Sequence, residues 1–358
     1  MTKARTNASA SPAVGRNMVI NGAMNVAQRS ASVTGIGASA GYFTCDRWQI
    51  DTGSSAGRLT MSQTADGPNG ISANCIKLDC TTADTSIAAG EYLILAQRFE
   101  GQNLQRIGKG VAGAKQITVS FYVKASAAFD FVIELIDRDN DRQCSKLFST
   151  TTGWVRHELT YAADVDDGSS PFDDNNAASL DMYFWLHSGA TYAGGTLNTA
   201  AFANTTQANR AAGIDSFYSS TDNNFFITGV QLEVGPVATE FEQEDIGTTL
   251  AKCQRYFTKA TGDANLPVAQ GSGINGTTSF CEATLPVPMR AVPARTFGNL
   301  YMYQPSDLDI SAVTLSYGFA SATTVGLNVT HADGGVAGKS AMILLDADAG
   351  FLAFDAEL

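Results

Sequence analysis

Histidine is the side chain that most often transfers protons or binds metals near neutral pH, and this chain has three. His157 and His187 fall in predicted strands, and His331 falls in a predicted turn. No HxH or HExxH spacing occurs, so a histidine-based metal site is not expected, and no cofactor is predicted. A serine-nucleophile elbow is not expected either, because the strand-rich pattern offers no strand–helix turn to hold one.

Carboxylates alternate in the sequence DRDNDRQC at 137–144, as the first ligands of a calcium-binding loop do. The match stops there, because Arg142 stands where such a loop needs glycine and Phe148 stands where it needs a bidentate glutamate. We therefore predict a polar hairpin turn. The acidic stretch 164–174 is predicted to be a solvated loop, with a Ca²⁺ site as the alternative, so the identity of any bound metal stays open.

Hydrolysis of a glycosidic bond needs two carboxylates at a defined separation in a cleft. The candidates that lie within predicted strands are Glu134, Glu158, Asp181 and Glu233. Nothing in the sequence singles out a pair among them. The chain is therefore predicted not to be an enzyme, and a polysaccharide depolymerase is the alternative.

Aromatic rings offer a different chemistry, because their flat faces can stack on sugar rings. The predicted glycan-binding residues are Trp154, Trp185, Tyr192 and Tyr218. A place in the hydrophobic core is the alternative for each of them. Two long connections, 164–178 and 188–220, contain few large apolar residues. Loops of that length are usually functional or disordered, so they are the predicted binding surface.

Strands must position most of these side chains. The stretch 225–234 alternates with period two, which predicts a strand with one buried face. The residues predicted to share that face are Phe226, Thr228, Val230, Leu232 and Val234. Gly235-Pro236 ends the strand.

The period then changes to that of a helix, predicted over 245–259. Its apolar positions are Ile246, Leu250, Cys253 and Phe257. Short alternating strands with turn residues between them precede and follow this helix. The pattern predicts an all-β fold, with an N-terminal antiparallel jelly-roll sandwich at 42–244, the short linking helix, and a smaller C-terminal β-sandwich at 260–358.

Residues 1–41 are predicted to form an N-terminal arm. Within it, Val19 and Ile20 are followed by the strong turn signal Asn21-Gly22. This part of the arm is interpreted either as a hairpin or edge strand of the first domain or as an attachment segment. The attachment residues would be Asn17, Val19, Ile20, Asn21, Met24, Gln28 and Arg29.

Composition excludes several functional classes. The net charge is −12, and no cluster of lysine and arginine occurs, which argues against nucleic-acid binding and against anionic membranes. No signal peptide is visible and no run is long enough to span a bilayer, so folding in a cytoplasm is expected. The six cysteines form no CxxC pair and are predicted to be free buried thiols.

A series of short motifs resembles the virion fibre proteins of phages, often described as tail fibre or minor structural proteins. The motifs, in order, are NMVINGAM at 17–24, QR at 28–29, DRW at 46–48, QRFEGQN at 97–103, VSFYVKA at 119–125, ITGVQLEVG at 227–235, CQRYF at 253–257 and PVPMRAVP at 286–293. Each motif is short, and their common order makes the resemblance specific.

The resemblance implies a homotrimeric virion appendage whose first domain is similar to a carbohydrate-binding module. The helix residues Ile246, Leu250, Cys253 and Phe257 would then form the trimer interface near the threefold axis. The implied partners are other virion proteins and a host surface polysaccharide, with assembly in the host cytoplasm. The N-terminal stretch 1–15 is short for a virion anchor, so a capsid decoration or head fibre protein is the alternative.

Overall fold

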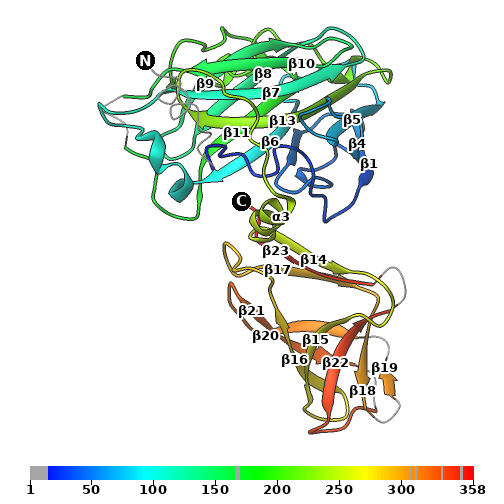
Figure 1. Cartoon of the computed structure of the whole chain (residues 1–358). Helices are drawn as coiled ribbons and strands as arrows, with labels where there is room; N and C mark the ends of the chain where they lie inside the picture. Colours follow the sequence, from blue (N-terminus) through cyan, green and yellow to red (C-terminus); the bar gives the residue numbers. More distant parts are fainter. Residues whose placement is uncertain (1–14, 166–169, 306–307, 311–312, 332–333, 347–349) are drawn as a thin grey trace. The chain divides into compact units, whose positions relative to one another are not determined.

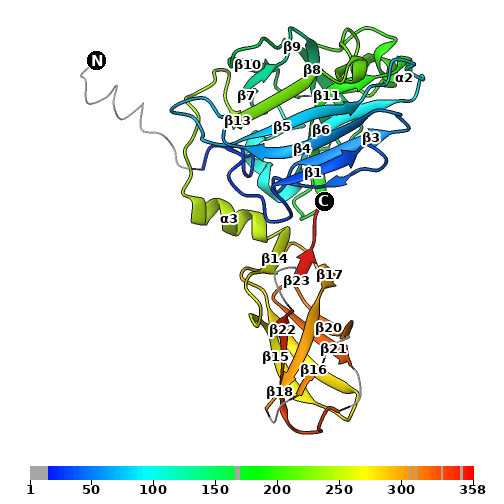
Figure 2. The ribbon, with the colours of Figure 1, turned by 90° about the vertical axis from the view of Figure 1, so that its right-hand side faces the viewer.

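The computed structural model describes residues 15–165, 170–305, 308–310, 313–331, 334–346 and 350–358. The chain divides into two compact units, Met1–Asp245 and Ile246–Leu358. The division falls at the start of the predicted linking helix. Figure 1 and Figure 2 show both units from two sides, and each unit is described by itself below.

The first unit is a sandwich of two antiparallel sheets (Figure 1). The six-stranded sheet has the order β1 (Ser32–Ile36), β4 (Arg58–Thr64), β5 (Cys75–Thr82), β13 (Asn224–Val234), β7 (Ile117–Ala125) and β10 (Val155–Tyr161). The seven-stranded sheet has the order β12 (Ala203–Asn204), β9 (Arg142–Ser149), β8 (Asp130–Asp137), β11 (Ala178–Ser188), β6 (Tyr92–Glu100), β3 (Gln49–Gly53) and β2 (Gly41–Tyr42).

Short helices lie in the connections of this unit: η1 (Gly101–Asn103), η2 (Gln105–Ile107), α2 (Ala190–Ala193), η3 (Gln207–Asn209) and η4 (Phe217–Ser219). Neighbouring strands such as β13 and β5, or β11 and β6, are far apart in the sequence. These crossed connections are those of a jelly roll. The predicted all-β class and jelly-roll sandwich are therefore confirmed.

A bulge in β13 changes the predicted face of that strand. The pairing of β13 with β7 shifts register between Thr228 and Gln231, and Gly229 has φ +60°. Glycine enters this left-handed conformation without a steric penalty. As a result Phe225 and Ile227 join Val230 and Leu232 in the core. The prediction that Phe226 shares the core face was wrong, because strict alternation ignores the extra residue in the bulge.

Residues 17–29 are built into the first unit and do not form a separate arm. Met24 is fully buried and Asn21 is 2% exposed. The Asn17 side chain accepts a hydrogen bond from the Leu232 backbone nitrogen, at 3.1 Å. Ile20 is hydrogen-bonded to Gln97, and the Asn21 side chain donates to the carbonyls of Val26 and Asp46. The Asp46 carboxylate in turn accepts a hydrogen bond from Gln28 and pairs with Arg29. Of the two interpretations, the structure supports a segment of the first domain, since these groups already have partners within the sandwich.

The second unit contains two further antiparallel sheets. The three-stranded sheet has the order β14 (Phe257–Thr261), β23 (Phe351–Asp355) and β17 (Ala294–Gly298). The seven-stranded sheet has the order β19 (Leu308–Ile310), β18 (Leu300–Gln304), β22 (Ser340–Leu345), β15 (Pro267–Gly273), β16 (Thr278–Thr284), β21 (Thr324–Thr330) and β20 (Thr314–Ala320). Apolar side chains from both sheets share one core, as the predicted second sandwich requires.

The helix that begins this unit, α3, spans Ile246–Gln254 and is shorter than predicted. Phe257 lies in β14 and pairs with Asp355, so its predicted place on the helix was wrong. Helical spacing continues by chance across the helix end, while β-branched and aromatic residues there favour a strand. Ile246 is 55% exposed, Leu250 is half-buried and Cys253 is fully buried. No helix among the described residues has the length and apolar character needed to cross a membrane.

Candidate functional site

The outer face of the seven-stranded sheet in the first unit gathers aromatic and charged side chains. Alternation along β11 directs Asp181, Tyr183 and Trp185 to this face, while Leu180, Met182 and Phe184 enter the core. The register then places Arg98 and Glu134 beside them. We call the following set the aromatic–charged face: Asp51, Tyr92, Arg98, Glu134, Arg138, Asp181, Tyr183, Trp185, Tyr192 and Arg210.

One half of the aromatic–charged face is organised around Glu134, which is fully buried. The Trp185 indole donates a hydrogen bond to its carboxylate at 2.8 Å, and Arg210 forms an ion pair with it at 3.0 Å. The Arg210 guanidinium also lies 4.9 Å from the centre of the Trp185 ring. Burial raises the pKa of Glu134, and the contacts with Arg210 and Trp185 oppose that shift. This half is therefore a closed, internally satisfied network.

The segment between β11 and η4 covers this closed half. Tyr192 lies 5.3 Å from Trp185 and 5.4 Å from Tyr92, measured between ring centres. Ala211 is buried against the same cluster and donates its backbone N–H to the Tyr192 carbonyl. Since these contacts leave Trp185 only 1% exposed, the indole supports the face from below and offers no stacking surface.

The other half is organised around Asp181 and is open to solvent at its rim. The Tyr183 hydroxyl donates to Asp181 Oδ2 at 2.5 Å, and Arg138 Nη1 lies 2.7 Å from the same oxygen. Arg98 lies between two carboxylates, 3.8 Å from Asp181 and 3.9 Å from Asp51. The side chain of Arg138 is 44% exposed, and those of Arg98 and Asp51 are each 20% exposed.

Asp181 has one oxygen left over. Its Oδ1 is buried and has no hydrogen-bond partner, although a buried carboxylate oxygen normally has one. Tyr92 borders this half and its hydroxyl donates to Asp51 at 3.3 Å. Burial, followed by the neighbouring Asp51 carboxylate, raises the pKa of Tyr92 to about 12, so the phenol stays a donor. The open half thus offers guanidinium donors, a carboxylate acceptor and phenol rings at one place.

The predicted glycan-binding residues divide between different parts of the unit. Trp185 and Tyr192 come together in the aromatic–charged face. Trp154 lies at the outer face of the other sheet, where Lys124 is 5.2 Å from its ring centre. Tyr218 is fully buried and packs edge-on against His187. Direct stacking of a ligand on Trp185 or Tyr218 does not fit their burial, because neither ring has an accessible face.

Sequence reasoning missed most of the residues in the open half. Asp51, Tyr92, Arg98 and Arg138 come from two strands, β3 and β6, and a turn that only the sheet brings together. One signal was present: within the apolar stretch of β11, the residues Asp181, Tyr183 and Trp185 recur with period two. Such a polar–aromatic face on a central strand indicates a functional surface on a sandwich.

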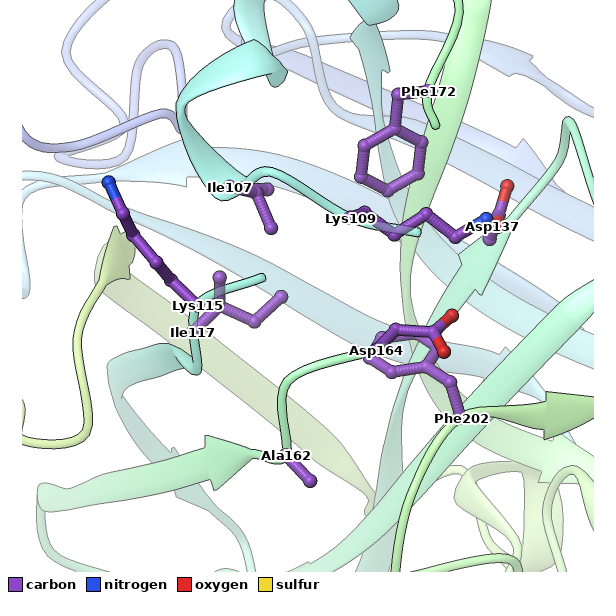
Figure 3. Close-up of a pocket in the computed structure, with 9 residues that line it drawn as sticks. All are labelled: Ile107, Lys109, Lys115, Ile117, Asp137, Ala162, Asp164, Phe172 and Phe202. Carbon is purple, nitrogen blue, oxygen red and sulfur yellow. Dashed lines mark ion pairs between the residues drawn. The ribbon is translucent and has the colours of Figure 1, made fainter. Parts of the chain in front are cut away.

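A second feature, at one end of the first unit, is a small cavity whose lining is drawn in Figure 3. Its volume is about 10 Å³, the lower limit for one water molecule. Lys109 reaches across it to Asp137, and Asp164 pairs with Arg142 at 2.9 Å (Figure 3 draws Lys109, Asp137 and Asp164). This end is closed by buried ion pairs, so we assign it a structural role.

The contacts of Asp137 show that residues 137–144 form a hairpin turn. Asp137 accepts hydrogen bonds from the Asp139 and Asn140 backbone nitrogens and pairs with Lys109. The flanking strands β8 and β9 pair directly, with Asp137 opposite Arg142. The predicted polar hairpin turn is confirmed, because the carboxylate that would begin a calcium loop serves the turn and the ion pair.

Comparisons with known proteins gave structural similarities only. No family model matches the sequence, and no curated protein matches it. A family 4 carbohydrate-binding module is 11% identical, with a TM-score of 0.30, over 60% of this chain and 97% of that one. A family 61 module solved with β-1,4-galactotriose is 10% identical, with a TM-score of 0.31, over 62% and 99%.

A third similar structure is the first family 22 xylan-binding domain of a Paenibacillus barcinonensis protein. It is 14% identical, with a TM-score of 0.28, over 53% of this chain and 87% of that domain. All three similar structures are carbohydrate-binding modules. The jelly-roll description of the first unit rests on its own sheet order and register.

Proposed function

We propose that the first unit is a glycan-binding module and that its ligand sits on the open half of the aromatic–charged face. The observation that carries the proposal is the environment of Asp181. A buried carboxylate oxygen without a partner lies beside the exposed Arg138 and the partly exposed Arg98 and Asp51. A sugar hydroxyl can donate to a carboxylate and accept from a guanidinium at the same time.

The chemistry of this half suits a polyhydroxylated ligand better than a charged one. Asp51 and Asp181 nearly balance Arg98 and Arg138, so no single sign of charge dominates the patch. The Tyr92 ring at its border adds an apolar surface on which a sugar face can pack. The side chains are also held before any ligand arrives, since each contacts another member of the network, which lowers the entropy cost of binding.

For the whole chain we propose a non-catalytic structural role in a phage virion, as a trimeric tail fibre or adhesin that contacts a host surface polysaccharide. The support is the ordered series of motifs that resembles such proteins and a glycan-binding first unit. The trimer would be formed around α3, where Ile246 and Leu250 are apolar and at least partly exposed. Virion partners are proposed to contact a surface other than the buried segment 17–29.

The proposal of a non-catalytic role rests on the carboxylates of the face. Glu134 is held by Arg210, and Asp181 is held by Arg138 and Tyr183. A glycosidase needs one carboxyl group that carries a proton and a second that is ionised, flanking the scissile bond. Each carboxylate is occupied by an arginine of the same face, and both residues are buried, so we propose that neither flanks a scissile bond. Release of reducing sugar from a bound polysaccharide would contradict this part of the proposal.

The test uses the folded full chain and a panel of purified bacterial surface polysaccharides, followed by calorimetry with any polysaccharide that binds. Arg138→Ala and Tyr92→Ala should each weaken binding at least tenfold. The matched control is Trp154→Ala, which removes another partly exposed aromatic residue from the opposite sheet. Binding that survives both face variants but is lost in the control would move the site to the other sheet and overturn the proposal, as would no binding to any member of the panel.

A further inference from the structure

A cluster of three metal-ligating side chains, none of which belongs to the aromatic–charged face, lies at an end of the sandwich. Asp84 and Glu91 come from the connection between β5 and β6, and His187 is the penultimate residue of β11. One ligand atom from each residue lies within 4.8 Å of the other two. Among the described residues, this is the group of three side chains whose ligand atoms are close enough to share a metal ion. Sequence spacing could not indicate it, because the three residues come from two distant segments.

The three side chains are buried and two of their atoms lack partners. Asp84 is 5%, Glu91 is 6% and His187 is 0% exposed. His187 Nε2 and Glu91 Oε2 are 3.7 Å apart, and neither atom forms a hydrogen bond. Two ligands of a tetrahedral zinc ion are separated by about 3.3–3.6 Å. The observed separation is therefore close to the one that a shared ion would impose.

The other groups at the site hold its ligands in place. His187 Nδ1 lies 2.7 Å from Ser216 Oγ, and an imidazole that donates from Nδ1 directs its Nε2 lone pair at the carboxylates. Asp84 accepts hydrogen bonds from the Ser55 hydroxyl and the Ala56 backbone nitrogen, at 2.9 and 2.8 Å. Metal ligands are commonly oriented by second contacts of this kind.

The charges at this site do not balance. Within the described part of the chain, no lysine or arginine forms an ion pair with Asp84 or Glu91. Two buried carboxylates therefore meet around one imidazole, an arrangement that a bound cation would stabilise.

We propose that Asp84, Glu91 and His187 together bind one divalent transition-metal ion of the zinc class. An imidazole with two carboxylates is a ligand set that such ions accept, whereas Ca²⁺ and Mg²⁺ take oxygen ligands alone. The ion would tie the β5–β6 connection to the end of β11 and so stabilise this end of the sandwich. The inference is independent of the proposed glycan-binding function, because it involves none of the residues of that face.

The test is a titration of the full chain with ZnCl₂ after removal of metals by a chelator, followed by calorimetry and thermal unfolding. We expect one Zn²⁺ per chain and a rise in melting temperature. His187→Gln and Glu91→Gln should each weaken binding at least tenfold, while the control His157→Gln should bind like the wild type. No binding to folded wild-type protein, or unchanged affinity in both ligand variants, would overturn the proposal.

A spectroscopic measurement keeps the test decisive if a ligand variant fails to fold. Co²⁺ bound to the wild type should show d–d absorption without a thiolate charge-transfer band, because no cysteine belongs to the cluster. A thiolate band would place the metal on cysteine and contradict the proposal. Binding of Ca²⁺ that Zn²⁺ cannot displace would also contradict it, since the imidazole would then not be a ligand.

Discussion

The guanidinium of Arg210 lies 4.9 Å from the ring centre of Trp185, and both side chains bind the same buried carboxylate, that of Glu134. The arginine comes from the segment after β11 and the other two residues come from the sheet. This contact therefore attaches the covering segment to the sheet by charge as well as by packing. Because the covering segment lies over the half around Glu134, this contact keeps that half closed and leaves the half around Asp181 open.

Removal of one partner from this ion pair should be strongly destabilising. Arg210→Ala leaves the Glu134 carboxylate buried without its cation, and breaking a buried pair in this way costs about 3–5 kcal/mol. The double variant Arg210→Ala with Glu134→Gln should recover part of that loss, because the stranded charge is gone. Chemical denaturation of each variant measures the free energy of unfolding. Equal stability of the single and double variants would show that the charge itself is unimportant.

Glycine at position 229 should be required by the bulge of β13. A Cβ there would lie 2.8 Å from both Ile71 and Tyr122 side chains, and the φ of +60° is unfavourable for any L side chain. Gly229→Ala should therefore lower the free energy of unfolding by about 1–3 kcal/mol. Gly153→Ala is the control, because open space surrounds that position and its backbone is ordinary. An unchanged free energy of unfolding in Gly229→Ala would show that β13 can pair with β7 without the bulge.

The sequence predicted the fold class because alternation and turn residues report directly on strands with one buried face. It failed where the backbone departs from strict periodicity, as in the bulge at Gly229 and the early end of α3 at Gln254. It also failed for both proposed sites. Arg98 and Asp181, like Glu91 and His187, meet only through pairing of β6 with β11, and no local pattern encodes that pairing.

Acidification should destabilise the first unit, in part through His157. Burial lowers the pKa of His157 below its ordinary value of 6.5, although a hydrogen bond to the Ser149 carbonyl opposes the shift. The unfolded chain therefore takes up a proton first as the pH falls, so the contribution of His157 to stability is complete above pH 6.5 and is lost from there toward the folded-state pKa.

His157→Gln should weaken this dependence on pH, because glutamine does not titrate. Part of the dependence should remain, since burial lowers the pKa of His187 in the same direction. Melting temperatures measured from pH 7.5 to pH 5 for the variant and the wild type, both with chelator present, check the prediction. Parallel curves for the two proteins would mean that His157 does not contribute.

Trimerisation, if it occurs through α3, should depend on the exposed apolar residues of that helix. Ile246 is 55% exposed, so burial of its remaining exposed part against another copy would contribute about 1 kcal/mol per chain, roughly half the value for a fully exposed isoleucine. Ile246→Asp should convert a trimer to monomers, because an unpaired carboxylate would enter the interface. Val237→Asp is the matched control, since Val237 is 69% exposed in the first unit. Light scattering gives the molar mass of each protein, and a wild-type chain that is monomeric at high concentration would rule out this mode of assembly.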